Sequence, residues 1–156
     1  MHDISKLTKF KMTTYANSLG YRVKQLQAVL RQRMDEALAA DGIATPQFAA
    51  LSALREVPGA TNAELARACF VTPQTMHRIT TRLVEEGLLE VSEDPHDAKK
   101  RRLSLTRKAG PLLRRADRHV EALEASMIEG MDPDELERTG RHIEDCRRRL
   151  ETTRSD

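Results

Sequence analysis

Apolar residues recur every three or four positions over much of this chain, a spacing typical of amphipathic helices. A first helix is predicted over residues 16–40, and Gly42 suits a left-handed cap after its end. A second is predicted from Thr45-Pro46, with Thr45 as the N-cap and Pro46 in the first turn. The expected buried stripes are Leu19, Val23, Leu26, Leu30, Met34, Ala37 and Leu38 in the first helix, and Phe48, Leu51, Leu54 and Val57 in the second.

The pattern changes in the middle of the chain, where two short helices precede two short alternating segments. Thr61 and Glu64 have the spacing of a capping box, and Thr72-Pro73 has the residues of a second helix start. The predicted bounds are 61–69 and 73–87 for the helices, 88–92 and 102–106 for the strands, and 93–97 for the turn between the strands. This order predicts a helix-turn-helix followed by a β-hairpin wing.

Helical spacing resumes after residue 107. The apolar positions are Leu112, Leu113, Ala116, Val120, Leu123 and Met127, and then Leu136, Ile143 and Leu150. Between these two sets, Asp132-Pro133 restarts a helix, with two acids at its positive end. A small central lobe cannot cover all of these stripes, so we expect a homodimer with interleaved terminal helices. A monomeric helical bundle packed on the lobe is the alternative.

The predicted fold is therefore mainly α, with a winged helix-turn-helix lobe, a two-stranded wing, and N- and C-terminal dimerisation helices. The expected divisions are an N-terminal arm (1–15), a dimerisation helix (16–44), the winged helix-turn-helix lobe (45–106) and C-terminal dimerisation helices (107–156). The 156 residues are only 3% aromatic and include no Trp, which favours aliphatic packing, much of it between subunits.

Positive charge is concentrated in one segment, although the formal net charge is only +2. Nine Lys or Arg residues and a single acid lie within residues 99–118. A basic block next to a helix-turn-helix favours a polyanion partner, here DNA, over a merely solvated surface.

The second helix of the helix-turn-helix separates apolar from polar residues. Met76 and Leu83 share one face, whereas Gln74 and Arg78 point away from it. Gln and Arg can make bidentate contacts with adenine and guanine edges, while hydroxyls and a helix N-terminus suit phosphates. An ordinary polar surface helix is the alternative, and His77 fits a DNA contact and an idle surface position equally. The predicted DNA-binding residues are Thr61, Asn62, Thr72, Gln74, Thr75, His77, Arg78, Thr81, Arg82, Lys99, Lys100 and Arg101.

The hairpin is expected to carry its cations to the minor groove or to flanking phosphates. Asp94 and Asp97 lie beside these cations, where Asp commonly forms turns through its own backbone. Of the two, Asp97 is the preferred candidate for a supporting residue that orients a basic side chain of the wing.

Together these features resemble the MarR family of transcriptional regulators over about residues 16–150. The matching motifs are TPQFAALSAL, ELARACFVTPQTMHRITTRLVEEGLLE and DPHDAKKRRLSLT. The last is the most specific, because the family wing commonly reads Asp-Pro-x-Asp-Arg-Arg before a strand that ends in Leu-Thr. The chain departs from the family at Ala98-Lys99, where Arg-Arg is usual, at Phe70, where Gly is common, and at Ala109, where Gly is frequent.

The resemblance implies a winged-helix homodimer that binds palindromic operator DNA, and we expect a repressor. It also implies release from DNA, often by a small-molecule inducer or an oxidant. It also implies an effector cleft between the dimerisation helices and the lobe. The candidate lining residues are Tyr21, Leu26, Leu30, Phe48 and Leu51, although helical spacing explains the apolar ones as core.

The sequence gives little support for redox chemistry, a metal site or a bound cofactor. Cys69 is expected to be a buried structural thiol with a raised pKa, and Cys146 is a lone helical cysteine. No spacing of His, Cys or acids suggests a metal site, and we expect no cofactor.

The remaining function classes are weighed as follows. An enzyme is disfavoured, because neither a Gly-rich phosphate loop nor a nucleophile–base pair is present. The absence of a signal peptide and of a long apolar run indicates a cytoplasmic protein with no membrane partner. A winged helix used for low-specificity nucleoid binding or for protein contacts stays open, and equal affinity for all DNA sequences would favour it.

Overall fold

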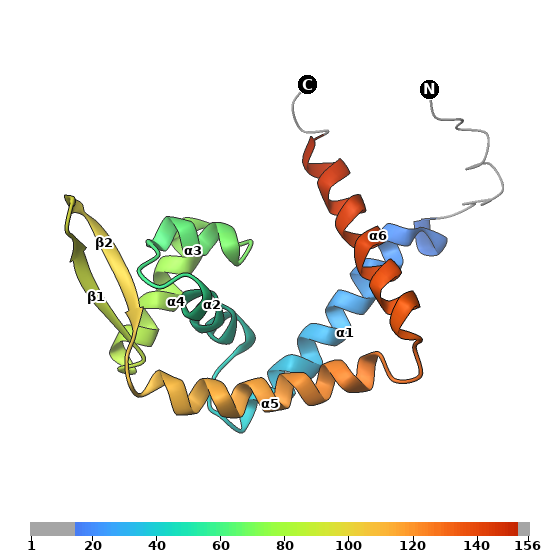
Figure 1. Cartoon of the computed structure of the whole chain (residues 1–156), viewed down its shortest axis with the longest axis horizontal. Coiled ribbons are helices and arrows are strands. Elements are labelled where there is room, and N and C mark those ends of the chain that lie inside the picture. The colour runs from blue at the N-terminus through green and yellow to red at the C-terminus, as the bar shows by residue number, and fades with distance from the viewer. Residues whose placement is uncertain (1–14, 153–156) are drawn as a thin grey trace. The chain divides into compact units, whose positions relative to one another are not determined.

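The computed structural model describes residues 15–152, which contain six α-helices and a two-stranded antiparallel sheet (Figure 1). The helices are α1 (Leu19–Ala39), α2 (Thr45–Glu56), α3 (Asn62–Ala68), α4 (Pro73–Glu85), α5 (Ala109–Met127) and α6 (Pro133–Thr152), and the strands are β1 (Leu89–Asp94) and β2 (Asp97–Leu105). The mainly α, winged helix-turn-helix fold that the sequence predicts is confirmed. The predicted arm of residues 1–15 lies outside the described residues except for Tyr15.

The chain divides into two compact units within α5. The first unit runs to Val120 and holds α1 to α4, the hairpin and most of α5. The second starts at Glu121 and holds the end of α5 and all of α6. The helix-turn-helix and its wing therefore lie entirely within the first unit.

The start of α2 corrects one sequence-based assignment. Ala44 is the N-cap and Thr45 is already helical, so Thr45 does not cap its own helix. The Thr45 hydroxyl donates instead to Oδ1 of Asp35 at 2.6 Å, and the backbone N–H of Ala44 donates to Oε1 of Gln47 at 2.9 Å. The prediction missed this because the Asp35 partner is ten residues away on α1, beyond what a local capping pattern reveals.

The two helices of the helix-turn-helix begin as predicted. The hydroxyl of Thr61 accepts from the backbone N–H of Glu64, whose carboxylate accepts from Thr61 in return, which confirms the capping box. Thr72 caps α4 by accepting from the backbone N–H of Thr75 at 3.1 Å. The turn between the helices contains Phe70 at φ 54°, a left-handed conformation that costs a non-glycine residue about 1–2 kcal/mol.

The hairpin is longer than the sequence pattern indicated. Its strands continue to Asp94 and start again at Asp97, so the predicted five-residue turn shrinks to Pro95-His96. Glu93 pairs with Arg101, and the register then shifts so that residues 98–100 have no cross-strand partner. The added strand residues are mostly charged, and the prediction relied on alternation of apolar residues, so it did not include them.

Two backbone hydrogen bonds attach the base of the hairpin to the lobe. The N–H of Leu103 donates to the carbonyl of Ala60, and its carbonyl accepts from Gly59, both at 3.1 Å. Gly59 and Ala60 directly precede the cap of α3. The wing and the helix-turn-helix are therefore joined through the main chain as well as through side chains.

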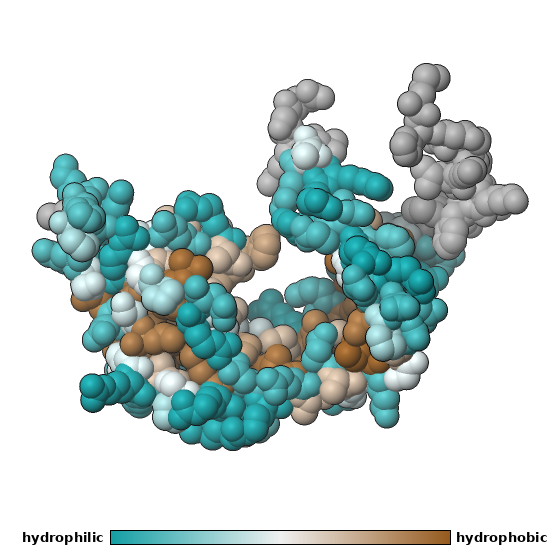
Figure 2. Space-filling view, in the orientation of Figure 1, coloured by the Kyte–Doolittle hydropathy of each residue, from teal (hydrophilic) through white to brown (hydrophobic). Residues whose placement is uncertain are grey.

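An aliphatic core holds α2, α3, α4 and the first half of α5 together, as the low aromatic content implied. In the space-filling view, hydrophobic residues are visible between the hydrophilic residues that cover this lobe (Figure 2). The most deeply buried large side chains are Leu38, Leu51, Leu54, Leu65, Met76, Leu83 and Leu113. Val57, predicted to continue the buried stripe of α2, is instead exposed, because the helix ends at Glu56.

The apolar stripe of α1 is covered only in part. Leu38 is completely buried in the lobe, and Leu30 is half-buried. Towards the N-terminal end of the same stripe, Val23 and Leu26 have about half of their surface exposed, 48% and 50%. One helix face thus passes from the core of the lobe to an uncovered surface.

The second unit has the predicted helix start and an uncovered apolar stripe of its own. Asp132 accepts from the backbone N–H groups of Asp134 and Glu135, which confirms the cap of α6. Along α6, Ile143 and Leu150 remain exposed. None of the described helices combines the length and hydropathy needed to cross a membrane.

Candidate nucleic-acid interface

Helix α4 presents a polar face opposite its buried one. Met76, Thr80 and Leu83 are buried, and this fixes the rotation of the helix on the lobe. The side chains on the other face are Gln74, His77, Arg78 and Thr81, all of them exposed. Within the described chain, these four side chains make no hydrogen bond or ion pair, so their polar atoms remain available to a ligand such as a base edge.

The N-terminal turn of α4 is also polar and exposed. The hydroxyl of Thr72 donates to that of Thr75 at 2.9 Å while it caps the helix. The backbone N–H groups of this turn carry the positive end of the helix dipole, which suits a phosphate oxygen. Thr72 and Thr75 therefore fit the phosphate-contact role predicted for them.

Thr61 and Asn62 instead have internal roles. Thr61 is held in the capping box of α3. The amide of Asn62 bridges α3 to α4, since its nitrogen donates to the carbonyl of Pro73 at 2.9 Å and its oxygen accepts from Thr80 at 3.1 Å. This geometry gives both residues a structural role in the helix-turn-helix, and their contacts with DNA stay a prediction. Thr80, which the sequence analysis overlooked, completes the bridge.

Arg82 lies at the far end of the exposed face and is already paired. Its Nε donates to Oε1 of Glu86 at 2.8 Å, and Gln47 donates to the other carboxylate oxygen at 3.2 Å. The positive charge of Arg82 is partly neutralised in this way, whereas that of Arg78, one turn earlier, is not. Arg78 and Arg82, both predicted to contact DNA, therefore differ in whether their charge is already paired.

Both candidate aspartates of the wing lie beside a basic side chain: Asp94 beside Arg102, and Asp97, the preferred candidate, beside Lys100. Only 5% of the Asp94 side chain is exposed, and its Oδ2 lies 2.6 Å from Nε and 2.5 Å from Nη2 of Arg102. Nη1 of Arg102 donates to the carbonyl of Gly59 at 3.0 Å and lies 3.7 Å from the Glu64 carboxylate. Arg102 therefore connects the wing to the start of α3.

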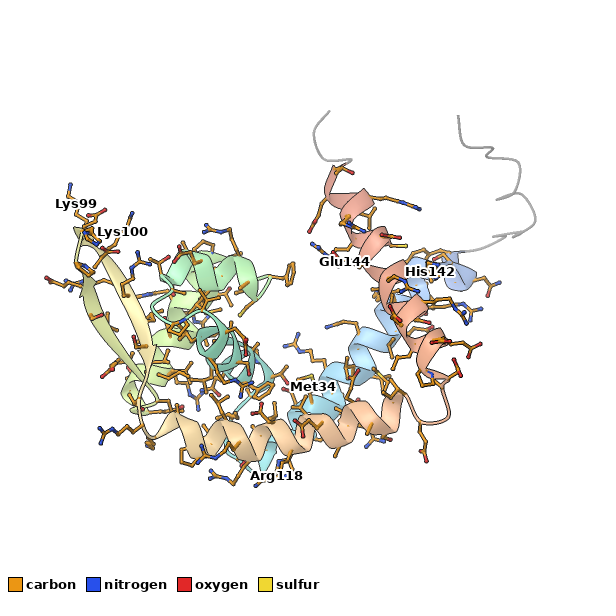
Figure 3. All side chains as sticks on the ribbon, viewed as in Figure 1. Met34, Lys99, Lys100, Arg118, His142 and Glu144 are labelled. Carbon is orange, nitrogen blue, oxygen red and sulfur yellow. The ribbon has the colours of Figure 1, made fainter. Side chains whose placement is uncertain are left out.

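The other wing cations differ in how far they are engaged. Nζ of Lys100 lies 3.6 Å from Asp97, and Arg101 donates to Glu93 across the hairpin at 2.9 Å. The side chain of Lys99 has no such partner in the described chain; its backbone N–H donates to Asp97. Lys99 and Lys100 project from the end of the hairpin (Figure 3), where hydrophilic residues cover the surface (Figure 2).

Acid should loosen the contact between the wing and α3 only well below neutral pH. The backbone N–H of His96 and the Arg102 guanidinium lower the pKa of Asp94 below its usual value of about 3.9. A lowered folded-state pKa means that the charged carboxylate stabilises the fold above that usual value and that the contribution disappears as pH falls through the folded pKa. We expect the wild type and Asp94→Asn to differ in Tm by a constant amount from pH 5 to 8 and to converge towards pH 3. A difference that grew on acidification would contradict this.

The predicted effector residues differ in their burial within the described chain. Phe48 and Leu51 are core residues, and Leu30 packs half-buried. Leu26 is exposed, and the ring of Tyr21 contacts that of Tyr15 edge-on at 5.2 Å between centroids. These five positions therefore remain predictions that depend on what covers α1.

The two cysteines are each half-buried. Cys69 packs against the core, and burial raises the pKa of its thiol, as expected. A raised pKa keeps the thiol protonated and slow to oxidise.

Known proteins resemble this chain in sequence. A model of the MarR family matches residues 41–100. The HTH-type transcriptional repressor Rv2887 of Mycobacterium tuberculosis is 33% identical over 110 residues, which cover 70% of this chain and 79% of that protein.

Solved structures agree in fold. The Mycobacterium tuberculosis Rv2887 complex with salicylic acid is 29% identical, with a TM-score of 0.67, over 83% of this chain and 96% of that one. The S. aureus MepR–DNA complex is 18% identical, with a TM-score of 0.79, over 88% and 99% of the two chains. The transcriptional repressor CouR, bound to a DNA duplex, is 21% identical, with a TM-score of 0.76, over 94% and 98%. The chain belongs to the MarR family of transcriptional regulators.

Proposed function

We propose that this regulator is a sequence-specific repressor that binds a palindromic operator as a homodimer and leaves it when a small organic molecule binds. The observation that carries the proposal is the exposed face of α4, where Gln74 and Arg78 have no partner within the described chain. Both can make bidentate contacts with base edges. A basic hairpin lies in the same unit and supplies cations for the backbone or the minor groove.

A relative supports the proposal that the protein represses transcription and that a ligand releases it from DNA. Rv2887, at 33% identity, is named a transcriptional repressor, and its solved complex contains salicylic acid. We infer the same class of effector for this chain, a small aromatic acid.

The uncovered part of the α1 stripe supports a dimer. Leu19, Val23 and Leu26 continue the buried stripe at helical spacing but remain exposed in the single chain. A second copy of the protein that supplies its own terminal helices would cover them, and Ile143 and Leu150 of α6 need cover in the same way.

Leu26→Glu should therefore shift the protein towards monomer, because a buried interface charge is unfavourable. Ala28→Glu is the matched control, since at about 100° per residue it lies on the opposite side of α1. Sedimentation velocity measures the proportions of monomer and dimer in each variant. A Leu26→Glu protein as dimeric as the control would contradict the assignment of this face.

Lys99→Ala should weaken binding to every DNA sequence. One lost phosphate contact in each protomer removes two per dimer, so the slope of log K against log salt concentration should flatten by about 2. Lys24→Ala, an exposed lysine of α1, is the control. An unchanged slope in the Lys99 variant would place that side chain in solvent.

Footprinting tests the geometry of the proposal. Two copies of α4 in successive major grooves should protect two half-sites whose centres lie about 10 base pairs apart. Protection of a single asymmetric half-site would rule out the dimeric arrangement.

A further inference from the structure

An open cavity of about 470 Å³ lies in the first unit, and none of the four exposed side chains on the polar face of α4 lines it. Three parts of the chain line it: the turn after α1, the C-cap of α4 with the residue before β1, and Lys108 with the first two turns of α5. A cavity of this size can hold a small organic molecule. It includes none of the five effector residues that the family resemblance suggested.

The inner surface of the cavity is apolar. Ile43, Leu88 and Leu112 line it, and each is a core residue with less than a tenth of its surface exposed. Such a surface favours the hydrocarbon part of a ligand over water.

Two cationic side chains, Lys108 and Arg115, also line the cavity, and each keeps N–H groups that have no partner in the described chain. Lys108 uses one ammonium hydrogen on the carbonyl of Glu86 at 2.7 Å, and an ammonium group has three. Arg115 donates through Nε to Asp41 at 3.0 Å and through Nη1 to Pro111, and in the described chain its Nη2 has no partner.

The two acids that line the cavity are, by contrast, already engaged. The Asp41 side chain is only 3% exposed, and its oxygens contact Arg115 and Nδ1 of His119. The oxygens of Glu86 accept from Arg82 and Gln47. The cavity therefore offers a ligand spare N–H donors, whereas its carboxylate oxygens are occupied.

We propose that this cavity binds the effector, a small amphiphilic organic anion whose carboxylate contacts Lys108 and Arg115 and whose ring lies on Ile43, Leu88 and Leu112. The ligand class rests on the proposed function, and the location rests on the cavity itself.

The position of the site gives it a route to the DNA-reading helix. The Lys108–Glu86 bond satisfies a carbonyl at the C-cap of α4, and a carboxylate that draws Lys108 away releases that carbonyl. The same ligand contacts Arg115, which holds the turn between α1 and α2 through Asp41. Occupancy therefore alters contacts at the C-terminal end of α4 and at the end of α1 together.

Titration of the full-length protein with salicylate, followed by NMR of the isoleucine δ1 methyl groups, tests the location. The chain has five isoleucines, of which Ile43 lies in the cavity, Ile79 on α4 and Ile143 on α6. We expect a saturable shift of the Ile43 signal and no shift of Ile143. An unmoved Ile43 signal, with or without shifts elsewhere, overturns the proposal.

Variants test the contacts. Lys108→Gln should weaken salicylate binding roughly three- to tenfold, as expected for one lost charge-assisted hydrogen bond at a part-exposed site. Arg115→Lys, which keeps the charge near Asp41, should weaken it less. Arg118→Gln is the matched control, since Arg118 is exposed on α5 one turn further on (Figure 3) and does not line the cavity. Equal affinity in all three variants overturns the site.

The outcome separates this site from the proposed function. Operator binding is measured on the same protein without salicylate. If the protein binds its operator but the Ile43 signal does not respond, the proposed repressor function stands and the proposed ligand site is wrong. If the Ile43 signal responds but the protein binds no operator, the ligand site stands and the proposed repressor function is wrong.

Discussion

Arg78→Ala is expected to cost about 1–3 kcal/mol of operator affinity for each base contact it removes, and to relax the preference at one base pair of each half-site. Arg78 lies on the exposed face of α4, and no acid in the described chain pairs with it. Its guanidinium is therefore free to make the bidentate contact with guanine that Arg favours. Competition binding against single-base variants of the operator measures both effects.

A basic residue elsewhere provides the control for this experiment. Arg118→Ala removes the same side chain from α5, so it should leave sequence preference unchanged. If Arg78→Ala weakened binding equally for every operator variant, Arg78 would be a backbone contact and the base-reading role would have to move to Gln74 or His77.

Leu83→Ala is expected to destabilise the protein by about 2–5 kcal/mol, enough to unfold a marginally stable lobe. The side chain of Leu83 is completely buried on the inner face of α4. An alanine at this position leaves a cavity that the surrounding aliphatic side chains fill only in part. Since this packing fixes the rotation of α4, loss of operator binding should accompany the loss of stability. Thermal denaturation followed by circular dichroism measures the change.

Val84 is the neighbouring residue in the same helix, and 38% of its surface is exposed. Val84→Ala should change stability by no more than about 0.5 kcal/mol, as exposed substitutions usually do. Equal effects of the two substitutions would mean that the buried face of α4 has been assigned wrongly.

The sequence predicted the local features of the fold well. Helix starts at Thr61, Thr72 and Asp132 follow from side chains that bond backbone groups two or three residues away, so a short window contains all the information. Gly42, predicted to follow α1 in a left-handed conformation, has φ 71°. The buried faces of α2 and α4 follow from helical periodicity in the same way.

The prediction was weaker where a partner lies far along the chain. The hydroxyl of Thr45 bonds Asp35 on another helix, and Asn62 bonds Thr80 eighteen residues away. The choice of Asp94 over Asp97 as the partner of Arg102 depends on the register of the hairpin, which charged positions obscured. A sequence shows which cations exist, whereas only the fold shows which of them are already paired.

That distinction bears most on the DNA-contact residues. Arg82 and Arg101 carry a positive charge, as Arg78 and Lys99 do, but each donates to a glutamate within the lobe. Such exposed pairs are weak and do not prevent a phosphate contact, but they reduce the electrostatic gain from making one. Arg78 and Lys99 should therefore contribute more to DNA binding than their paired neighbours.

The most direct test of sequence-specific, dimeric DNA reading is selection of bound DNA from a random duplex library by the purified full-length protein at near-physiological salt. We predict enrichment of an inverted repeat with half-sites about one helical turn apart, because two copies of α4 must enter successive major grooves. Binding without any enriched sequence would contradict the account and would identify the chain as a low-specificity winged-helix protein.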